Sequence, residues 1–183
     1  MKATIAKWWV AIGALCLMTQ TAIAGAVDPS DVQRLIREGT ALHGRGQFDG
    51  ALEKYRAVLA LNPAHAEAHY EIVATLYAKK AWQDCIDAAN SALQTPSPFR
   101  ARLFVANGNC LDESGQRERA IATYEAGLRE FSRHPELGLN LAIAIQKGGD
   151  VSRSLSLMEK VLDDAPTYRT ANFDLGRVYA RQG

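Results

Sequence analysis

The chain has 183 residues, of which 48% are hydrophobic and 22% are charged. This length and this composition are typical of a globular domain with a substantial core. The formal net charge is +1 at pH 7, and there is no long run of like charges. The chain therefore lacks the basic character that nucleic-acid binding requires, and we expect no nucleic-acid partner.

The first 24 residues have the layout of a secretory signal peptide. Lys2 and Lys7 come before an uncharged apolar stretch over residues 8–18, and the small residues of "AIA" follow it and end at Ala24. The apolar stretch is much shorter than the ~20 residues needed to span a bilayer. We expect cleavage after Ala24, export, and no membrane insertion of the remaining chain. An uncleaved N-terminal anchor is the alternative, and it would also place the rest of the chain outside the cytoplasm.

A sequence pattern repeats from Val32 onwards, after a short linker over residues 25–31. The units begin at residues 32, 66, 101, 135 and 169, so that each complete unit is 34 or 35 residues long. A fixed period of this length is typical of a solenoid of stacked supersecondary units. We therefore predict one repeat domain over residues 32–183.

Each unit predicts two helices joined by a tight turn. Apolar residues recur at three- and four-residue spacing in both halves of the first unit, "LIREGTALHG" and "ALEKYRAVLAL". A glycine stands between the two halves in three units, as Gly46, Gly115 and Gly149, and Lys80 takes this place in the second unit. The eighth and twentieth positions of the units are mostly small, which predicts close contact between the two helices of a pair.

Several residues occupy the places that a known repeat family uses. They are Leu175 and Gly176 with Tyr179 three residues later, the pairs Ala51/Tyr55 and Ala120/Tyr124, and the terminal Pro63 and Pro166. On these residues the chain resembles the tetratricopeptide repeat (TPR) proteins. The resemblance implies an all-α fold, a right-handed α-α superhelix of antiparallel helix hairpins with about four and a half units. The second unit departs most, with Val73 and Ala89 where glycine and an aromatic residue are usual.

The resemblance and the geometry of stacked hairpins place the first helix of each unit along a concave groove. Positions 2, 5, 6, 9, 12 and 13 of a unit should face it, and several of them are apolar or aromatic. Such an exposed stripe usually marks a binding surface, here one suited to an extended or helical peptide. The expected lining residues are Ile36, Thr40, His43, Tyr70, Ala74, Tyr77, Val105, Asn109, Asp112, Leu139, Asn140, Ile143, Gln146, Phe173 and Arg177.

Asn109 and Asn140 are the most specific pair in this lining. A side-chain amide offers both a donor and an acceptor, so it can hold a peptide backbone whatever the peptide's side chains are. The resemblance implies this role, because peptide-binding TPR domains place asparagines at these two positions. Val105 and Asp174 replace the lysine and arginine of the carboxylate-clamp subclass, so recognition of an acidic chain end is not expected. The alternative is that both asparagines are solvated surface residues.

Two further alternatives remain open. Tyr70 and Tyr77 lie seven residues apart on one helix face and could be core residues of an irregular second unit instead of groove residues. Cys85 and Cys110 form either a disulfide across neighbouring units, which an oxidising compartment would allow, or two separately buried thiols.

Catalytic and metal-binding motifs find no support in the sequence. His65, Glu67 and His69 are not the HExxH arrangement and have no third ligand nearby, so a structural or surface role is expected. His43 and His134 have no serine or cysteine partner that the repeat would bring near them. We therefore expect no enzyme activity, no metal and no cofactor.

The leading hypothesis is a non-catalytic interaction scaffold that binds a peptide or a partner protein. The resemblance implies an exported bacterial protein of the periplasm, in pilus, secretion, outer-membrane or cytochrome biogenesis. One alternative is a self-assembling oligomer formed through the open last helix, at Val178 and Tyr179. Another is that the chain is the N-terminal part of a larger TPR protein.

Overall fold

A computed structural model describes residues 29–168, 170 and 174–177. Over residues 29–168 the chain forms eight α-helices and no strand. They are α2 (Pro29–Gly44), α3 (Phe48–Leu61), α4 (Ala66–Ala78), α5 (Trp82–Ala92), α6 (Arg100–Glu113), α7 (Arg117–Glu130), α8 (Pro135–Lys147) and α9 (Val151–Asp164). The predicted signal peptide, Phe173, Val178 and Tyr179 lie outside the described residues.

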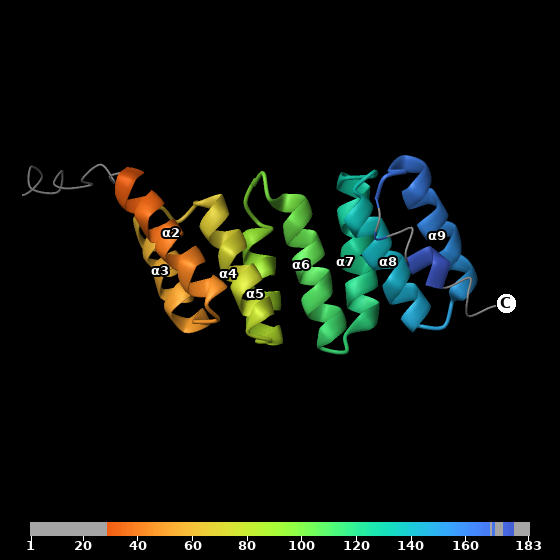
Figure 1. The fold of residues 1–183 in the computed structure, drawn as a ribbon, viewed down its shortest axis with the longest axis horizontal. Helices are drawn as coiled ribbons and strands as arrows, with labels where there is room; N and C mark the ends of the chain where they lie inside the picture. The colour runs from red at the N-terminus through yellow and green to blue at the C-terminus, as the bar shows by residue number, and fades with distance from the viewer. Residues whose placement is uncertain (1–28, 169, 171–173, 178–183) are drawn as a thin grey trace, which may run out of the picture.

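The helices pack as consecutive pairs in an elongated row. Figure 1 shows α2 and α3 at one end and α8 and α9 at the other, with the intermediate pairs in chain order. The first helices contact one another from pair to pair, α2 with α4, α4 with α6 and α6 with α8, and each second helix contacts the next first helix. The prediction of an all-α, TPR-like solenoid of helix hairpins is therefore confirmed.

The turn within each hairpin contains one residue in the left-handed region of backbone space. It is Gly46 (φ 73°), Gly115 (φ 82°), Gly149 (φ 98°) and, in the second hairpin, Lys80 (φ 61°). Glycine adopts this conformation without a steric penalty, whereas a side chain makes it unfavourable. The glycine of the sequence pattern is thus a requirement of the turn, and Lys80 carries some strain.

A tyrosine packed on a glycine fills the first and third hairpins. A Cβ atom added to Gly39 would lie 2.6 Å from Cε1 of Tyr55, and one added to Gly108 would lie 2.2 Å from Cε1 of Tyr124. Both tyrosine rings are buried. The glycine at position 8 therefore leaves room for the ring at position 24 of the same unit, in addition to bringing two helices together.

In the second hairpin the larger residue is at position 8 and the smaller residue is at position 24. Val73 stands at the position of Gly39 and Gly108, and Ala89 stands at the position of the tyrosines. Both Val73 and Ala89 are fully buried. The hairpin therefore buries both positions although neither has the residue of the family pattern.

The histidines of "HAEAH" have structural roles. Nδ1 of His65 accepts a hydrogen bond from the Ala68 N–H at 3.2 Å, which caps the start of α4. The other, His69, places Nε2 2.8 Å from the Pro63 carbonyl oxygen. His134 caps α8 in the same way, accepting from the Leu137 N–H at 3.4 Å.

A disulfide joins the second hairpin to the third. Cys85 of α5 and Cys110 of α6 are bonded, with Cα atoms 6.3 Å apart, and both residues are fully buried. Position 20 of one unit and position 10 of the next therefore lie close enough for a covalent link across the hairpin boundary.

Candidate functional site: a groove across α4, α6 and α8

Two adjoining cavities open on the face formed by the first helices. One has a volume of about 220 Å³ and is lined by Tyr70, Ala74, Tyr77, Arg102, Val105, Ala106, Asn109 and Glu136. The other has a volume of about 200 Å³ and is lined by Tyr77, Asn109, Asp112, Glu113, Tyr124, Asn140, Ile143 and Lys147. Because they share Tyr77 and Asn109, they form one groove, called the A-helix groove below.

The wall of the groove on α4 is aromatic. Tyr70 stacks on Phe99 of the α5–α6 connection, with ring centroids 5.2 Å apart, and the Arg102 guanidinium lies 5.9 Å from the Tyr70 ring. Tyr77 is 37% exposed and its ring lies 5.6 Å from that of Trp82. Both tyrosines therefore line the groove while neighbouring rings hold them in place.

The two asparagines meet at the centre of the groove. Oδ1 of Asn109 accepts a hydrogen bond from the Tyr124 hydroxyl at 2.7 Å and another from Nδ2 of Asn140 at 3.0 Å. These two bonds fix the orientation of the Asn109 amide. Its Nδ2 donor and the Oδ1 acceptor of Asn140 have no partner among the described residues. The pair is therefore an ordered donor and acceptor on the groove surface.

Charged groups surround the polar half of the groove. The Asp112 carboxylate forms ion pairs with Lys147 and, at 3.7 Å, with Arg117. Burial raises the pKa of the Tyr124 hydroxyl far above its usual range, and Asp112 adds to this effect. Burial also raises the pKa of Tyr77, to which Glu113 contributes. Both hydroxyls therefore stay protonated at neutral pH, so the Tyr124 hydroxyl remains a hydrogen-bond donor.

Some residues expected in the groove belong to the core instead. Ile36 is 6% exposed and Leu139 is 2% exposed. Leu139 packs in a buried cluster with Met158 and Val161. Position 5 borders both the groove and the hairpin interior, so a large apolar side chain there turns inward, away from water. Val105 is also buried but still contributes to the groove wall.

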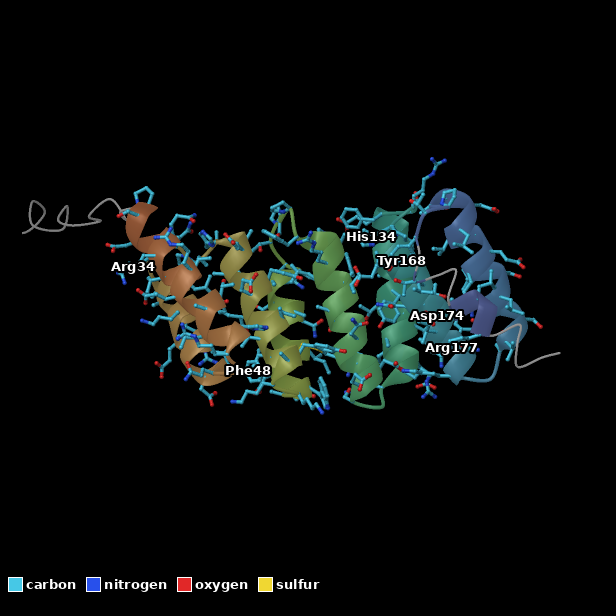
Figure 2. All side chains as sticks on the ribbon, in the orientation of Figure 1. Arg34, Phe48, His134, Tyr168, Asp174 and Arg177 are labelled. Carbon is cyan, nitrogen blue, oxygen red and sulfur yellow. A yellow bond between two sulfur atoms is a disulfide. The ribbon has the colours of Figure 1, made fainter. Side chains whose placement is uncertain are left out.

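The other expected residues that the structure describes lie beyond this groove. Thr40 donates its hydroxyl hydrogen to the Ile36 carbonyl at 3.0 Å, and Nδ1 of His43 lies 2.8 Å from the Thr75 hydroxyl oxygen. Both are on α2 and line neither cavity. Arg177 pairs with Asp174 at 3.6 Å, and Figure 2 shows these two side chains together at the α8–α9 end of the row. Gln146 lines neither cavity.

The sequence analysis included Asp112 but missed four other charged residues of the groove. Arg102 and Glu136 stand at position 2 of their units, and Glu113 and Lys147 stand at position 13. Positions 2 and 13 are among the groove-facing positions of a unit, so the spacing alone identifies these four residues. Phe99 had no such signal, because it lies in the connection between two units.

The described part of the chain contains neither a metal-binding cluster nor a membrane-spanning helix. No group of three or more histidine, cysteine, aspartate or glutamate side chains there is placed to hold a metal ion. None of the helices there is long and apolar enough to cross a bilayer.

Comparisons with known proteins agree with the fold. Residues 39–80 match the family model described as "TPR repeat". No curated protein sequence matches the chain. Solved structures with a similar fold include YrrB, a TPR protein with an unusual peptide-binding site, at 20% identity and a TM-score of 0.59, covering 81% of this chain and 76% of YrrB.

MamA structures are also similar to the chain. MamA from residue 41 to its end, from Desulfovibrio magneticus RS-1, has 21% identity and a TM-score of 0.65, and the match covers 76% of this chain and 78% of that one. A second MamA structure has 17% identity and a TM-score of 0.65, covering 84% and 83%. At these identities the likeness establishes the fold alone.

Proposed function

We propose that the protein is a non-catalytic scaffold that holds an extended peptide segment of a partner in the A-helix groove. The observation that carries this proposal is the ordered Asn109–Asn140 pair, with one free donor and one free acceptor. Every peptide unit offers the complementary carbonyl and N–H groups. Nδ2 of Asn109 would donate to a backbone carbonyl, and Oδ1 of Asn140 would accept from a backbone N–H.

The neighbouring half of the groove supports the same proposal. Tyr70, Ala74, Val105 and Ala106 form an apolar surface next to the amide pair. A peptide held by its backbone at the asparagines can place one apolar side chain on this surface. Backbone hydrogen bonds then supply affinity, and the fit of that side chain supplies specificity.

The cellular setting is part of the proposal. Disulfides persist in oxidising compartments, and a fully buried one between two repeats fits a protein that folds after export. The N-terminal pattern of Lys2, Lys7 and the apolar stretch ending at Ala24 supports secretion. We place the protein in the bacterial periplasm, in the assembly of an envelope machine such as a pilus, a secretion system, the outer membrane or a cytochrome.

Selection of peptides by the purified protein tests the groove directly. A random-peptide display library is enriched on the wild type, and the best peptides are then measured by fluorescence anisotropy. The Asn109→Ala/Asn140→Ala variant should bind them about 5-fold to 150-fold more weakly, because two hydrogen bonds are lost at roughly 0.5–1.5 kcal/mol each.

A matched control separates the groove from general loss of amide groups. Gln83 and Gln94 belong to α5 and its C-terminal turn, are exposed and line neither cavity of the groove. The Gln83→Ala/Gln94→Ala variant should bind the peptides like the wild type. Equal affinities for the wild type and the asparagine variant would refute the groove assignment.

A further inference from the structure

A third cavity lies between α7, α8 and α9. Its volume is about 130 Å³, and it is outside the A-helix groove, near His134 at the start of α8 (Figure 2). It is lined by Leu128, Ser132, Arg133, His134, Pro135, Gly138, Leu157, Lys160, Val161 and Asp164. We call it the α8–α9 cavity.

The third hairpin has an aromatic ring at the equivalent place. Phe104 of α6 occupies the fourth position of its unit and is buried against Gly127 of α7, where an added Cβ would lie 3.0 Å from the Phe104 Cβ. Thirty-four residues later, Gly138 stands at the position of Phe104 and Val161 at that of Gly127. A Cβ on Gly138 would lie 2.5 Å from Cγ2 of Val161. The large and the small residue of the pair have thus changed places. Because Val161 is smaller than Phe104, a space remains beside Gly138.

The residues at the rim of the cavity also differ between the third and the fourth hairpin. In the third hairpin the Arg100 guanidinium lies 5.5 Å from the Phe104 ring and pairs with Glu130. At the equivalent positions the fourth hairpin has His134 and Asp164. Asp164 pairs with Arg133 at 3.7 Å, and His134 caps the start of α8.

One cation on this rim is unpaired. Lys160 lines the cavity and has no ion-pair partner among the described residues. With Arg133 and Lys160 against Asp164, the opening carries one excess positive charge. An apolar floor beneath a positive rim is complementary to a ligand with an apolar end and an anionic end.

We propose that the α8–α9 cavity binds an aromatic group that carries a carboxylate, with its ring in the space that Phe104 fills in the preceding hairpin. An apolar cavity of about 150 Å³ in another protein accepts benzene, so a space of this size holds one ring. The carboxylate lies at the rim beside the Lys160 ammonium. The ligand is a free aromatic acid or the chain end of a peptide whose last residue is aromatic.

Three probes test the chemistry by isothermal titration at low salt: N-acetylphenylalanine, its neutral amide, and acetyl-Ala-Ala-Phe with a free carboxylate. The acid should bind about two- to fivefold more tightly than the amide, the gain expected for one exposed ion pair. Lys160→Gln should remove that preference, while Lys54→Gln on α3 should keep it. Comparable binding of the tripeptide assigns the site to chain ends, and weaker binding assigns it to free acids. Equal affinities of acid and amide for the wild type would overturn the anionic part of the proposal.

Filling the cavity tests its location. Gly138→Phe/Val161→Gly copies the pair of the third hairpin and should abolish binding of all three probes. In the wild type, the ring of the bound acid should shift the NMR methyl resonances of Leu157 and Val161. Absence of those shifts, or a folded filled variant that binds like the wild type, would overturn the site. Asn109→Ala/Asn140→Ala should leave this binding unchanged, so its outcome is independent of the peptide groove.

Discussion

Replacing Gly108 and Tyr124 of the third hairpin with the residues at the equivalent positions of the second hairpin would test why Gly108 is required. Gly108→Val puts atoms where the Tyr124 ring lies, since even a Cβ would be 2.2 Å from Cε1 and 2.5 Å from Cζ of that ring. Ordinary van der Waals contact needs about 3.5–4 Å. The ring would have to move by more than 1 Å, and such overpacking costs about 1–3 kcal/mol or more.

The complementary change leaves a hole. Tyr124→Ala removes a buried ring, which costs about 3–5 kcal/mol in transfer and cavity terms. It also removes the hydroxyl that donates to Asn109. Each single variant should therefore be clearly destabilised, by opposite mechanisms.

The double variant Gly108→Val/Tyr124→Ala reproduces the Val73/Ala89 pair of the second hairpin. Valine then occupies part of the space of the ring, so the loss should be at least about 1–2 kcal/mol smaller than the sum of the two single losses. Urea unfolding followed by far-UV circular dichroism measures the three free energies of unfolding. Additivity within about 0.5 kcal/mol would refute the exchange of sizes as the reason for the departure of the second unit.

Three further outcomes follow from the structure. Reduction of the Cys85–Cys110 disulfide, which closes a loop of 25 residues, should lower the free energy of unfolding by about 3 kcal/mol; an unchanged urea midpoint in reductant would contradict it. Lys80→Gly should stabilise the protein by about 0.5–1 kcal/mol and Gly115→Ala should destabilise it by about 1 kcal/mol, because both turns have positive φ; thermal unfolding checks the opposite signs. Burial raises the pKa of Glu71, against a hydrogen bond from Tyr55, so the folded state disfavours its ionised form and loses stability as pH rises above its unfolded pKa. Glu71→Gln should therefore raise the urea midpoint at pH 7 but not at pH 4, and an equal change at both values would argue against a titration effect.

The sequence predicted the fold because the same residue pattern recurs in successive units. Small residues at fixed offsets and a glycine between the helices recur with one period, and each has a steric cause in the structure, as at Gly108 and Gly115. The phase of the repeat also assigned Asn109 and Asn140 to the same groove, and in the structure a 3.0 Å hydrogen bond joins them.

The details that escaped prediction depend on side-chain direction. Position 5 can face the groove or the core, and the sequence does not distinguish Val105, which lines the groove, from Leu139, which does not. Phe99 lies outside the repeating pattern, so its stacking on Tyr70 had no periodic signal. The space beside Gly138 depends on the paired change at Val161, a residue 23 positions later on another helix.

The covalent link between α5 and α6 has a consequence for how the molecule opens. In a row where each hairpin contacts only its neighbours, thermal fraying starts at an end and moves inward one hairpin at a time. The Cys85–Cys110 bond holds the second and third hairpins together, so we expect them to open after the first and fourth hairpins. Backbone amides of α4 to α7 should then exchange hydrogen with solvent last, and as one block. The α4 and α6 walls of the A-helix groove belong to this block and would persist, whereas the α8 wall with Asn140 would be lost each time the fourth hairpin opens.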